Sequence, residues 1–323
     1  MQSQVHTQAE SISGSYPQYG EAYAPGHITG FFTIHLSEDP VYTGSRGAGI
    51  CLEAGVTTRV TIRKSDKPEI VLLWNDMPLT DSRVSKSVMR RFFGPNVKLS
   101  VLVEQRSILP LNYGYGISGA SALSLALAVN KALGSPLPRV KAGEIAHLAE
   151  VENLTGLGDV SAQMVGGFEM RLLPGAPTVG RVQRLQTPED YLIITTPVKP
   201  VSTNKMISDH FAKINEKGEL AISSFMNSPT LDAFITLSRK FWESLWCLDP
   251  EIARVLKKYE SIGIKLVSLK KGLVYGLIHK DEAGSTLERI SPKSSQRTLP
   301  MLIYEPSVGL PIIVTRISSG GAC

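Results

Sequence analysis

A glycine-rich segment followed by an unusually apolar helix constrains this chain more than any other stretch of its sequence. Residues 110–133 read PLNYGYGISGASALSLALAVNKAL, and apolar residues fill nearly every helical face of the second half, so we predict a deeply buried helix. Gly114, Gly116 and Gly119 let the backbone turn tightly and approach a ligand closely. Ser118 stands where we expect the helix N-cap.

The start of such a helix suits an anion, because free N–H groups and the positive end of the helix dipole point there. A P-loop requires Gly-Lys-Ser/Thr, whereas this chain has Ile117-Ser118-Gly119, so a P-loop is excluded. The letters GYGISG fit the dinucleotide fingerprint, but Pro110 and Asn112 separate the glycines from the preceding strand, and residues 134–141 contain no Asp or Glu. A glycine-rich turn that only caps a core helix stays open.

Length, composition and charge limit the kinds of protein that this chain can be. A chain of 323 residues can bury a large core in one large or two moderate domains, and 42% hydrophobic with 20% charged residues is ordinary for a globular protein. The net charge of +5 comes from scattered residues without interleaved aromatics, which argues against nucleic acid. No stretch approaches 18 apolar residues and no apolar signal core is present, so we expect no membrane span and a cytoplasmic protein. Cys51, Cys247 and Cys323 are too scattered for a zinc site or a disulfide framework.

The order of elements predicts an α+β fold, because several strands precede the buried helix. Residues 1–20 are rich in Ser, Gln and Gly and are predicted to be a disordered tail. We expect an N-terminal domain at residues 21–188 and a smaller C-terminal α/β sandwich at residues 189–323. Within the first domain we expect a strand at 31–36, a glycine-rich loop at 40–49, and a helix at 81–93 that Asp81 caps.

Two segments after the buried helix carry candidate catalytic side chains. His147 and Glu150 lie three positions apart and share a helical face. Asp159 follows a glycine-flanked turn, from which a side chain can point into a pocket. Mg²⁺ prefers oxygen ligands and takes few protein carboxylates, so these acids could serve a metal and a hydroxyl acceptor. Helix capping by Asp159, and ordinary helix positions for Glu150 and His147, are the structural alternatives.

Arg171 stands inside an apolar stretch, where a guanidinium needs a carboxylate partner. Glu169 or a substrate could supply it.

Several separate motifs resemble one family. Residues 110–120 fit P-x3-G-x-G-x-S-[GS]-A, which is similar to the nucleotide loop of the GHMP kinases, among them galactokinase, homoserine kinase and mevalonate kinase. Four further stretches resemble the archaeal pantoate kinases within that family: APGHITGFF at 24–32, TGSRGAG at 43–49, AHLAEVENLTGLGDVSAQMVGGFEMR at 146–171, and VSTNK at 201–205. The resemblance implies a GHMP kinase-like two-domain fold, with an N-terminal domain like ribosomal protein S5 domain 2 and a ferredoxin-like C-terminal sandwich.

The resemblance also implies an activity, which is ATP- and Mg²⁺-dependent phosphorylation of pantoate in coenzyme A biosynthesis. Ser118 and Glu150 would bind Mg²⁺ and act in catalysis with Asp159, which would take the proton from the attacking hydroxyl. ATP would lie on the loop formed by Gly114, Tyr115, Gly116, Ile117, Ser118, Gly119 and Ala120. The residues implied to face pantoate are Ser45, His147 and Arg171.

His27 is part of the likeness to the archaeal pantoate kinases, because most other GHMP kinases carry Lys or Glu in its place. One departure from the family pattern leaves a question open, since the expected third glycine motif reads SLKKGL at 268–273 and has a single glycine. Lys270 and Lys271 could supply charge to phosphates there, or form a surface pair. Another small alcohol such as homoserine or mevalonate, a nucleotide-binding protein without catalysis, and a dinucleotide-dependent oxidoreductase are the rival functions. A homodimer is compatible with the sequence, although no feature demands one.

Overall fold

The computed structural model describes residues 17–67, 69–80, 82–94, 98–186, 191–245, 248–290, 299–305 and 309–323. The first part of the chain contains the strands β1 Gln18–His35, β2 Gly44–Lys64, β3 Glu69–Trp74, β4 Met77–Pro78, β5 Leu99–Arg106, β6 Phe168–Leu173 and β7 Arg181–Arg184. Its helices are α2 Arg83–Phe93, α3 Ile117–Ala132, α4 Arg139–Glu152 and α5 Asp159–Val165. The strands of the second part are β8 Tyr191–Pro197, β9 Leu266–Lys270, β10 Leu273–His279, β11 Met301–Glu305 and β12 Leu310–Arg316. The helices of the second part are α6 Thr203–Asn227, α7 Leu231–Leu245, α8 Pro250–Ser261 and α9 Lys280–Ile290.

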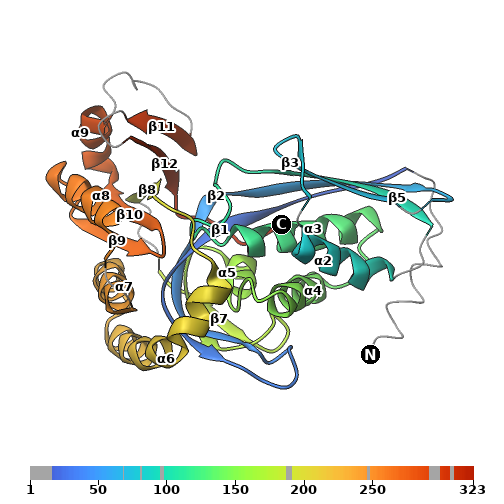
Figure 1. Cartoon of the computed structure of the whole chain (residues 1–323), viewed down its shortest axis with the longest axis horizontal. Helices are drawn as coiled ribbons and strands as arrows, with labels where there is room; N and C mark the ends of the chain where they lie inside the picture. The colour runs from blue at the N-terminus through green and yellow to red at the C-terminus, as the bar shows by residue number, and fades with distance from the viewer. Residues whose placement is uncertain are drawn as a thin grey trace.

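These elements build two sheets (Figure 1). The described strands of the first sheet run in the order β4-β3-β5-β2-β6-β7, and β1 pairs with β2 along almost its whole length. The second sheet has the order β11-β12-β8-β10-β9. The α+β prediction is therefore confirmed. Because the chain passes from one sheet to the other between Arg184 and Tyr191, we propose that the domain boundary lies near residue 188.

The predicted buried helix is α3, and it is the centre of the first core. All of its leucines and alanines are buried, and it packs on the long hairpin of β1 and β2. Gly20 of β1 makes this close packing possible, because a Cβ there would overlap the backbone of Ala128. The apolar sequence on every helical face thus has a structural cause, since neighbours surround the helix.

An aromatic cluster attaches the helices of the second part to the first sheet. Phe31 of β1 lies 5.4 Å from Phe225 of α6 between ring centroids, and Phe168 of β6 lies 5.3 Å from Phe234 of α7. Gly30 leaves room for the Phe234 ring, which a Cβ at that position would displace. The cluster holds α6 and α7 beside β1, as Figure 1 shows.

The C-terminal residues return to the first part. Cys323 and Tyr23 exchange two backbone hydrogen bonds, with N···O distances of 2.7 and 2.9 Å. The amide of Ala322 donates to the carbonyl of Gln163 at 2.8 Å. In Figure 1 the C-terminus accordingly lies among the elements of the first part. No helix in the described ranges is both long and apolar enough to cross a membrane.

Three sequence-based boundaries need correction. β1 begins at Gln18, so the end of the predicted tail belongs to the first sheet, while residues 1–16 lie outside the described ranges. The predicted loop at 40–49 is wrong from Gly44 onward, because β2 begins there and pairs with β1. The helix predicted from Asp81 begins at Arg83, and Asp81 itself lies outside the described residues.

Candidate active site

The glycine-rich loop between β5 and α3 turns directly into the helix. Gly116 is the N-cap of α3 and has a left-handed φ of 63°, a conformation that a side chain makes costly. The prediction that Ser118 is the N-cap is therefore wrong, because Ser118 lies in the first turn. The Ser118 hydroxyl does not cap the helix and instead donates a 2.5 Å hydrogen bond to Glu150 Oε1.

A cleft of about 500 Å³ opens along this loop. Residues 114–118 line it, together with residues 153–155 after α4 and residues 200–204 before and at the start of α6. This volume is within the range of small-molecule sites, so the cleft can hold a ligand of nucleotide size. Free N–H groups at the start of α3 give it an anion-binding end.

Glu150 on α4 is almost completely buried beside this cleft. Its Oε1 accepts hydrogen bonds from Ser118 and, at 2.7 Å, from Thr155, whereas its Oε2 has no hydrogen-bond partner among the described residues. Burial raises the pKa of the carboxyl to about 7, although the two hydroxyl hydrogen bonds act in the opposite direction. Gly156 keeps the space beside Oε2 open, because a Cβ there would overlap that oxygen.

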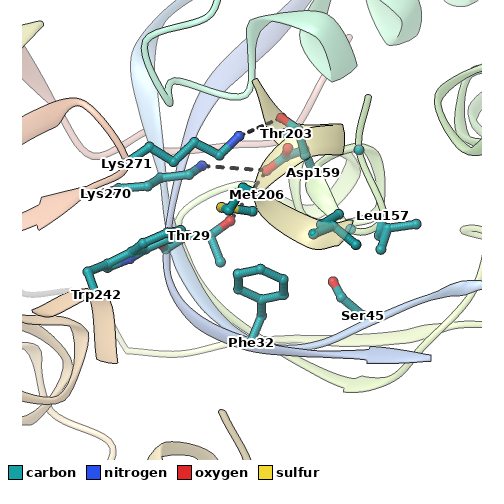
Figure 2. A pocket seen from close by; sticks show the side chains of 13 residues that line it. Thr29, Phe32, Ser45, Leu157, Asp159, Thr203, Met206, Trp242, Lys270 and Lys271 are labelled. Carbon is teal, nitrogen blue, oxygen red and sulfur yellow. Dashed lines mark hydrogen bonds and ion pairs between the residues drawn. The ribbon is translucent and has the colours of Figure 1, made fainter. Parts of the chain in front are cut away.

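A second and smaller cavity, about 40 Å³, adjoins the cleft. Phe32, Leu157, Met206, Ile207 and Trp242 give it apolar walls. Four residues line both cavities: Asp159, Thr203, Lys270 and Lys271. Figure 2 shows the two lysines pointing toward Asp159 and Thr203 from one side of the remaining space.

Asp159 begins α5 and makes its contacts through one oxygen. Its Oδ1 lies 2.6 Å from His27 Nδ1 and 3.9 Å from Lys270 Nζ, and it accepts a 3.4 Å hydrogen bond from the Thr29 hydroxyl. Burial alone raises the pKa of this carboxyl, but Lys270 and His27 more than offset burial and hold the pKa below its usual range. Asp159 is therefore a carboxylate at neutral pH. The alternative that it caps the helix with its side chain is not observed, since Gly158 is the N-cap.

Beneath Asp159 lies a buried chain of ionisable side chains. His27 Nε2 is 3.0 Å from Glu169 Oε1, which also accepts a 2.5 Å hydrogen bond from Arg171 Nη1. Glu169 and Arg171 lie on β6, opposite the glycines of β2. A Cβ at Gly49 would overlap the His27 ring and come within 2.7 Å of Glu169 Oε1, so the glycine provides the space for this pair.

The three residues predicted to face the acceptor have different positions. Ser45 lines the smaller cavity. Arg171 is 2% exposed and paired with Glu169, but within the described part of the chain its Nε has no hydrogen-bond partner. Ser45 Oγ and Arg171 Nε both lie within 2.9 Å of the place where a Cβ of Gly158 would be, so the missing side chain leaves a polar recess.

His147 lines neither cavity. It is buried on α4, and its Nε2 lies 2.9 Å from the carbonyl oxygen of Thr43, two residues before Ser45. Burial lowers the pKa of the ring, although hydrogen bonding to the backbone acts against this. The structure thus gives His147 a contact with the Ser45 segment rather than a place at the cavity.

The lysines whose role the sequence left open are buried, and the surface-pair alternative is wrong. Lys270 Nζ donates to the His27 carbonyl at 3.2 Å, and Lys271 Nζ donates to the Thr203 hydroxyl at 2.5 Å. Burial and the neighbouring Lys270 lower the pKa of Lys271 to about 8. The contact between His27 and Asp159 was not predicted from the sequence. The only indication in the sequence was that His27 belongs to the APGH segment.

Comparison with known proteins adds independent findings. Residues 82–167 match the family described as "GHMP kinases N terminal domain". A pantoate kinase of Thermococcus kodakarensis is 31% identical over 296 residues, which covers 89% of this chain and 97% of that protein. A pantoate kinase of Methanocaldococcus jannaschii is 37% identical over 222 residues, covering 68% and 78%.

Solved structures agree in fold. A structure titled "Phosphotransferase related to CoA biosynthesis pathway" has a TM-score of 0.80 and 26% identity, and the match covers 94% of this chain and 98% of that one. A homoserine kinase of Cytophaga hutchinsonii matches with a TM-score of 0.62 at 17% identity, covering 96% and 98%, which shows a shared fold alone.

Proposed function

This chain belongs to the pantoate kinase family of the GHMP kinases, and from that premise we propose that it phosphorylates (R)-pantoate with ATP. The product is (R)-4-phosphopantoate, an intermediate on the way to coenzyme A. One observation carries the proposal for the site: a cleft of nucleotide size and a small cavity share one carboxylate and two lysines. Two substrates bound there would meet at Asp159.

The nucleotide belongs in the larger cleft. Its phosphates would lie before α3, where backbone N–H groups from Gly116 onward point toward the cleft and the helix dipole favours negative charge. Glycines at 114 and 116 let the chain approach the phosphates without side chains in between. The loop would thus bind phosphate through its backbone N–H groups.

Ser118 and Glu150 are the proposed ligands of Mg²⁺. Mg²⁺ usually takes only one or two protein carboxylates and keeps several of its waters, so Glu150 with one hydroxyl ligand is sufficient. The unpartnered Glu150 Oε2 is a buried carboxylate oxygen that a cation would satisfy. When held by Ser118 and Glu150, the ion would neutralise negative charge on the phosphates. Thr155 and Ser118 meanwhile orient the carboxylate through Oε1.

The smaller cavity suits pantoate, which has a carboxylate at one end and two methyl groups on one carbon. The carboxylate fits the recess at Gly158, where Ser45 offers a hydroxyl and Arg171 an unpaired N–H. The apolar walls suit the methyl groups. Homoserine fits less well, because its ammonium group would enter a cavity that Lys270 and Lys271 already make positive.

Asp159 is the proposed proton acceptor. The acceptor hydroxyl oxygen attacks the γ-phosphorus, the bond from that phosphorus to the β–γ bridging oxygen breaks, and the hydroxyl proton passes to Asp159 as ADP leaves. Lys270 lowers the basicity of Asp159 in the free protein. A triphosphate beside Lys270 and Lys271 would offset this positive charge and raise the proton affinity of the carboxylate.

The test is release of ADP by the purified protein with ATP and Mg²⁺ in the presence of pantoate, pantothenate, homoserine or mevalonate. We expect turnover with pantoate alone and a product with the mass of phosphopantoate. Turnover only with another acceptor would contradict the substrate assignment while leaving the site intact. ATP binding without turnover on any acceptor would favour a non-catalytic nucleotide-binding protein.

A further inference from the structure

We propose that His27, Glu169 and Arg171 form a positioning network in which a doubly protonated His27 aims the Asp159 carboxylate at the acceptor hydroxyl. The inference rests on the function proposed above, because it concerns how that reaction's proton acceptor is held. His27 and Glu169 line neither cavity, so they act through Asp159, whereas Arg171 also reaches the recess at Gly158 through its Nε.

The protonation of His27 follows from its two partners. Its Nδ1 is 2.6 Å from Asp159 Oδ1 and its Nε2 is 3.0 Å from Glu169 Oε1. Arg171 Nη1 also lies 3.5 Å from Nε2, so a carboxylate oxygen is the nearer partner of each ring nitrogen. Neutral imidazole has one N–H, and its other nitrogen would direct a lone pair at a carboxylate oxygen. Only the imidazolium donates to both. The ring is fully buried, so no solvent replaces a missing donor.

Charges along the network alternate, which stabilises them in a buried place. Arg171 holds Glu169, Glu169 holds the His27 ring, and the ring holds Asp159. Glu169 is 0% exposed and Arg171 2%, so removing one partner would leave an uncompensated buried charge. A chain of this kind fixes its end member in place.

The fixed end is one oxygen of Asp159. The contacts from His27, Thr29 and Lys270 all reach Oδ1, and within the described ranges no hydrogen bond or ion pair to Oδ2 is found. Oδ2 is thereby left for the acceptor. Rotation of the Asp159 carboxylate would break its short hydrogen bond to His27, so the His27 ring fixes the direction in which Oδ2 points.

The sheet is adapted to this network. Gly49 lies within β2, where a glycine weakens a strand. Any side chain at Gly49 would displace the His27 ring, and one at Gly47 would come within 3.0 Å of Arg171 Nη2. The glycines of β2 therefore make room for the charged groups.

The protonation can be tested directly by nitrogen NMR of the histidine rings at neutral pH, with the His27 signals identified by their loss in His27→Gln. We expect both ring nitrogens of His27 to carry protons in the wild-type protein. A ring with one unprotonated nitrogen would overturn the proposal. This measurement does not depend on which substrate the protein uses.

The positioning role can be tested by two variants that each keep one half of the ring's bonding. The amide nitrogen of Asn reaches the place of Nδ1, and that of Gln reaches the place of Nε2. We expect His27→Gln to lower kcat with pantoate about 10²-fold, with little change in the KM for ATP, because it loses the bond to Asp159. His27→Asn keeps that bond and should lose about tenfold or less.

Controls separate positioning from stability. His35→Gln makes the same replacement at an exposed site at the end of β1 and should leave both constants unchanged. Equal kcat for His27→Asn and His27→Gln, or wild-type kcat in His27→Gln, would overturn the positioning role. A wild-type protein with a doubly protonated His27 but no activity on pantoate would instead contradict the proposed function.

Discussion

The two cavities that meet at Asp159 are built from different parts of the chain. The larger cleft, proposed to bind the nucleotide, is formed mainly by short continuous runs, residues 114–118, 153–155 and 200–204, and the first of these offers backbone groups. The smaller cavity, proposed to bind the acceptor, gathers single side chains from strands and helices far apart in sequence, such as Phe32 of β1 and Trp242 of α7. A cleft lined by backbone groups suits a ligand group that many enzymes share, such as a phosphate. A cavity lined by separate side chains can instead change its substrate preference through single substitutions.

The largest expected effect is at Asp159, the carboxylate that lines both cavities. Asp159→Asn removes the proposed proton acceptor, and we expect kcat to fall by about 10²–10⁴-fold. Binding of ATP should be retained or become tighter, because a negative charge near the phosphates is lost. Steady-state kinetics and ATP titration would check both effects.

Asp232→Asn, at an exposed position in the first turn of α7, is the matched control and should behave as wild type. Near-normal turnover of Asp159→Asn would exclude the residue as the proton acceptor.

The second effect concerns the lysine that joins the cavities. Lys270→Met removes a buried ammonium that faces Asp159 and both cavities, and we expect kcat to fall about 10²–10³-fold, as for loss of one preorganised charge at a transition state. Lys265→Met removes an exposed charge from the same part of the chain and should change little. Equal kinetics of the two variants would show that Lys270 has only a structural role.

A third change breaks the acceptor cavity alone. Gly158→Ala fills the recess between Ser45 and Arg171, and its φ of −153° tolerates a side chain, so the backbone should be unaffected. We expect the KM for pantoate to rise about tenfold or more, equivalent to about 1.4 kcal/mol, with the KM for ATP unchanged.

Gly284→Ala on α9 adds a Cβ with no neighbour within 4 Å and is the control. A rise in the KM for ATP rather than pantoate would reverse the assignment of the two cavities.

A fourth change is directed at the proposed nucleotide cleft. Gly116→Ala places a side chain at a φ of 63° and within 3.2 Å of His27 and Gln163, so we expect a loss of about 1–2 kcal/mol in the free energy of unfolding. The KM for ATP should rise about fivefold, since a cost of about 1 kcal/mol corresponds to that factor.

Gly134→Ala provides the matched control, because Gly134 has a φ of 80° and no neighbour within 4 Å of its Cβ. It should lose similar stability in thermal unfolding but keep the KM for ATP. A normal KM in Gly116→Ala would show that the loop does not hold the nucleotide.

The same contrast explains what the sequence could predict. The nucleotide loop, α3 and the acids Glu150 and Asp159 follow from local patterns, because backbone turns and helix starts depend on neighbouring residues. The fold class and the boundary between the sheets follow from the order of elements. The sequence also suggested Ser45 and Arg171, although it did not show that Gly158 brings their polar atoms to one recess.

The rest depends on contacts that no local pattern encodes. The glycines of β2 look like a loop in sequence, yet they are strand residues opposite the buried charges of β6. His27 and Asp159 are separated by 132 positions, and their contact exists only because β1 and α5 pack together. Lys270 and Lys271 resemble a surface pair until the β9–β10 turn places them in the cleft.

The smallest expected effect is on the pH dependence of kcat/KM for ATP. Two groups on opposite sides of the proposed nucleotide cleft, Glu150 and Lys271, should each set one limb of the profile. Glu150, with a pKa of about 7, must lose its proton to serve a cation, so kcat/KM for ATP should rise as the pH increases through about 7. Lys271, with a pKa of about 8, loses its charge at higher pH, so the same constant should fall above about 8.

Lys271→Arg separates the two limbs, because a guanidinium stays charged throughout this range. We expect the alkaline limb to disappear while the acidic limb remains near 7. Lys199→Arg, a replacement at a half-exposed lysine that pairs with Asp249 outside both cavities, should keep the wild-type profile. An unchanged alkaline limb in Lys271→Arg would mean that another group titrates there. The ATP phosphates would then be stabilised by the backbone N–H groups of the loop and by Lys270. The loop would in that case contribute more to phosphate binding than Lys271 does.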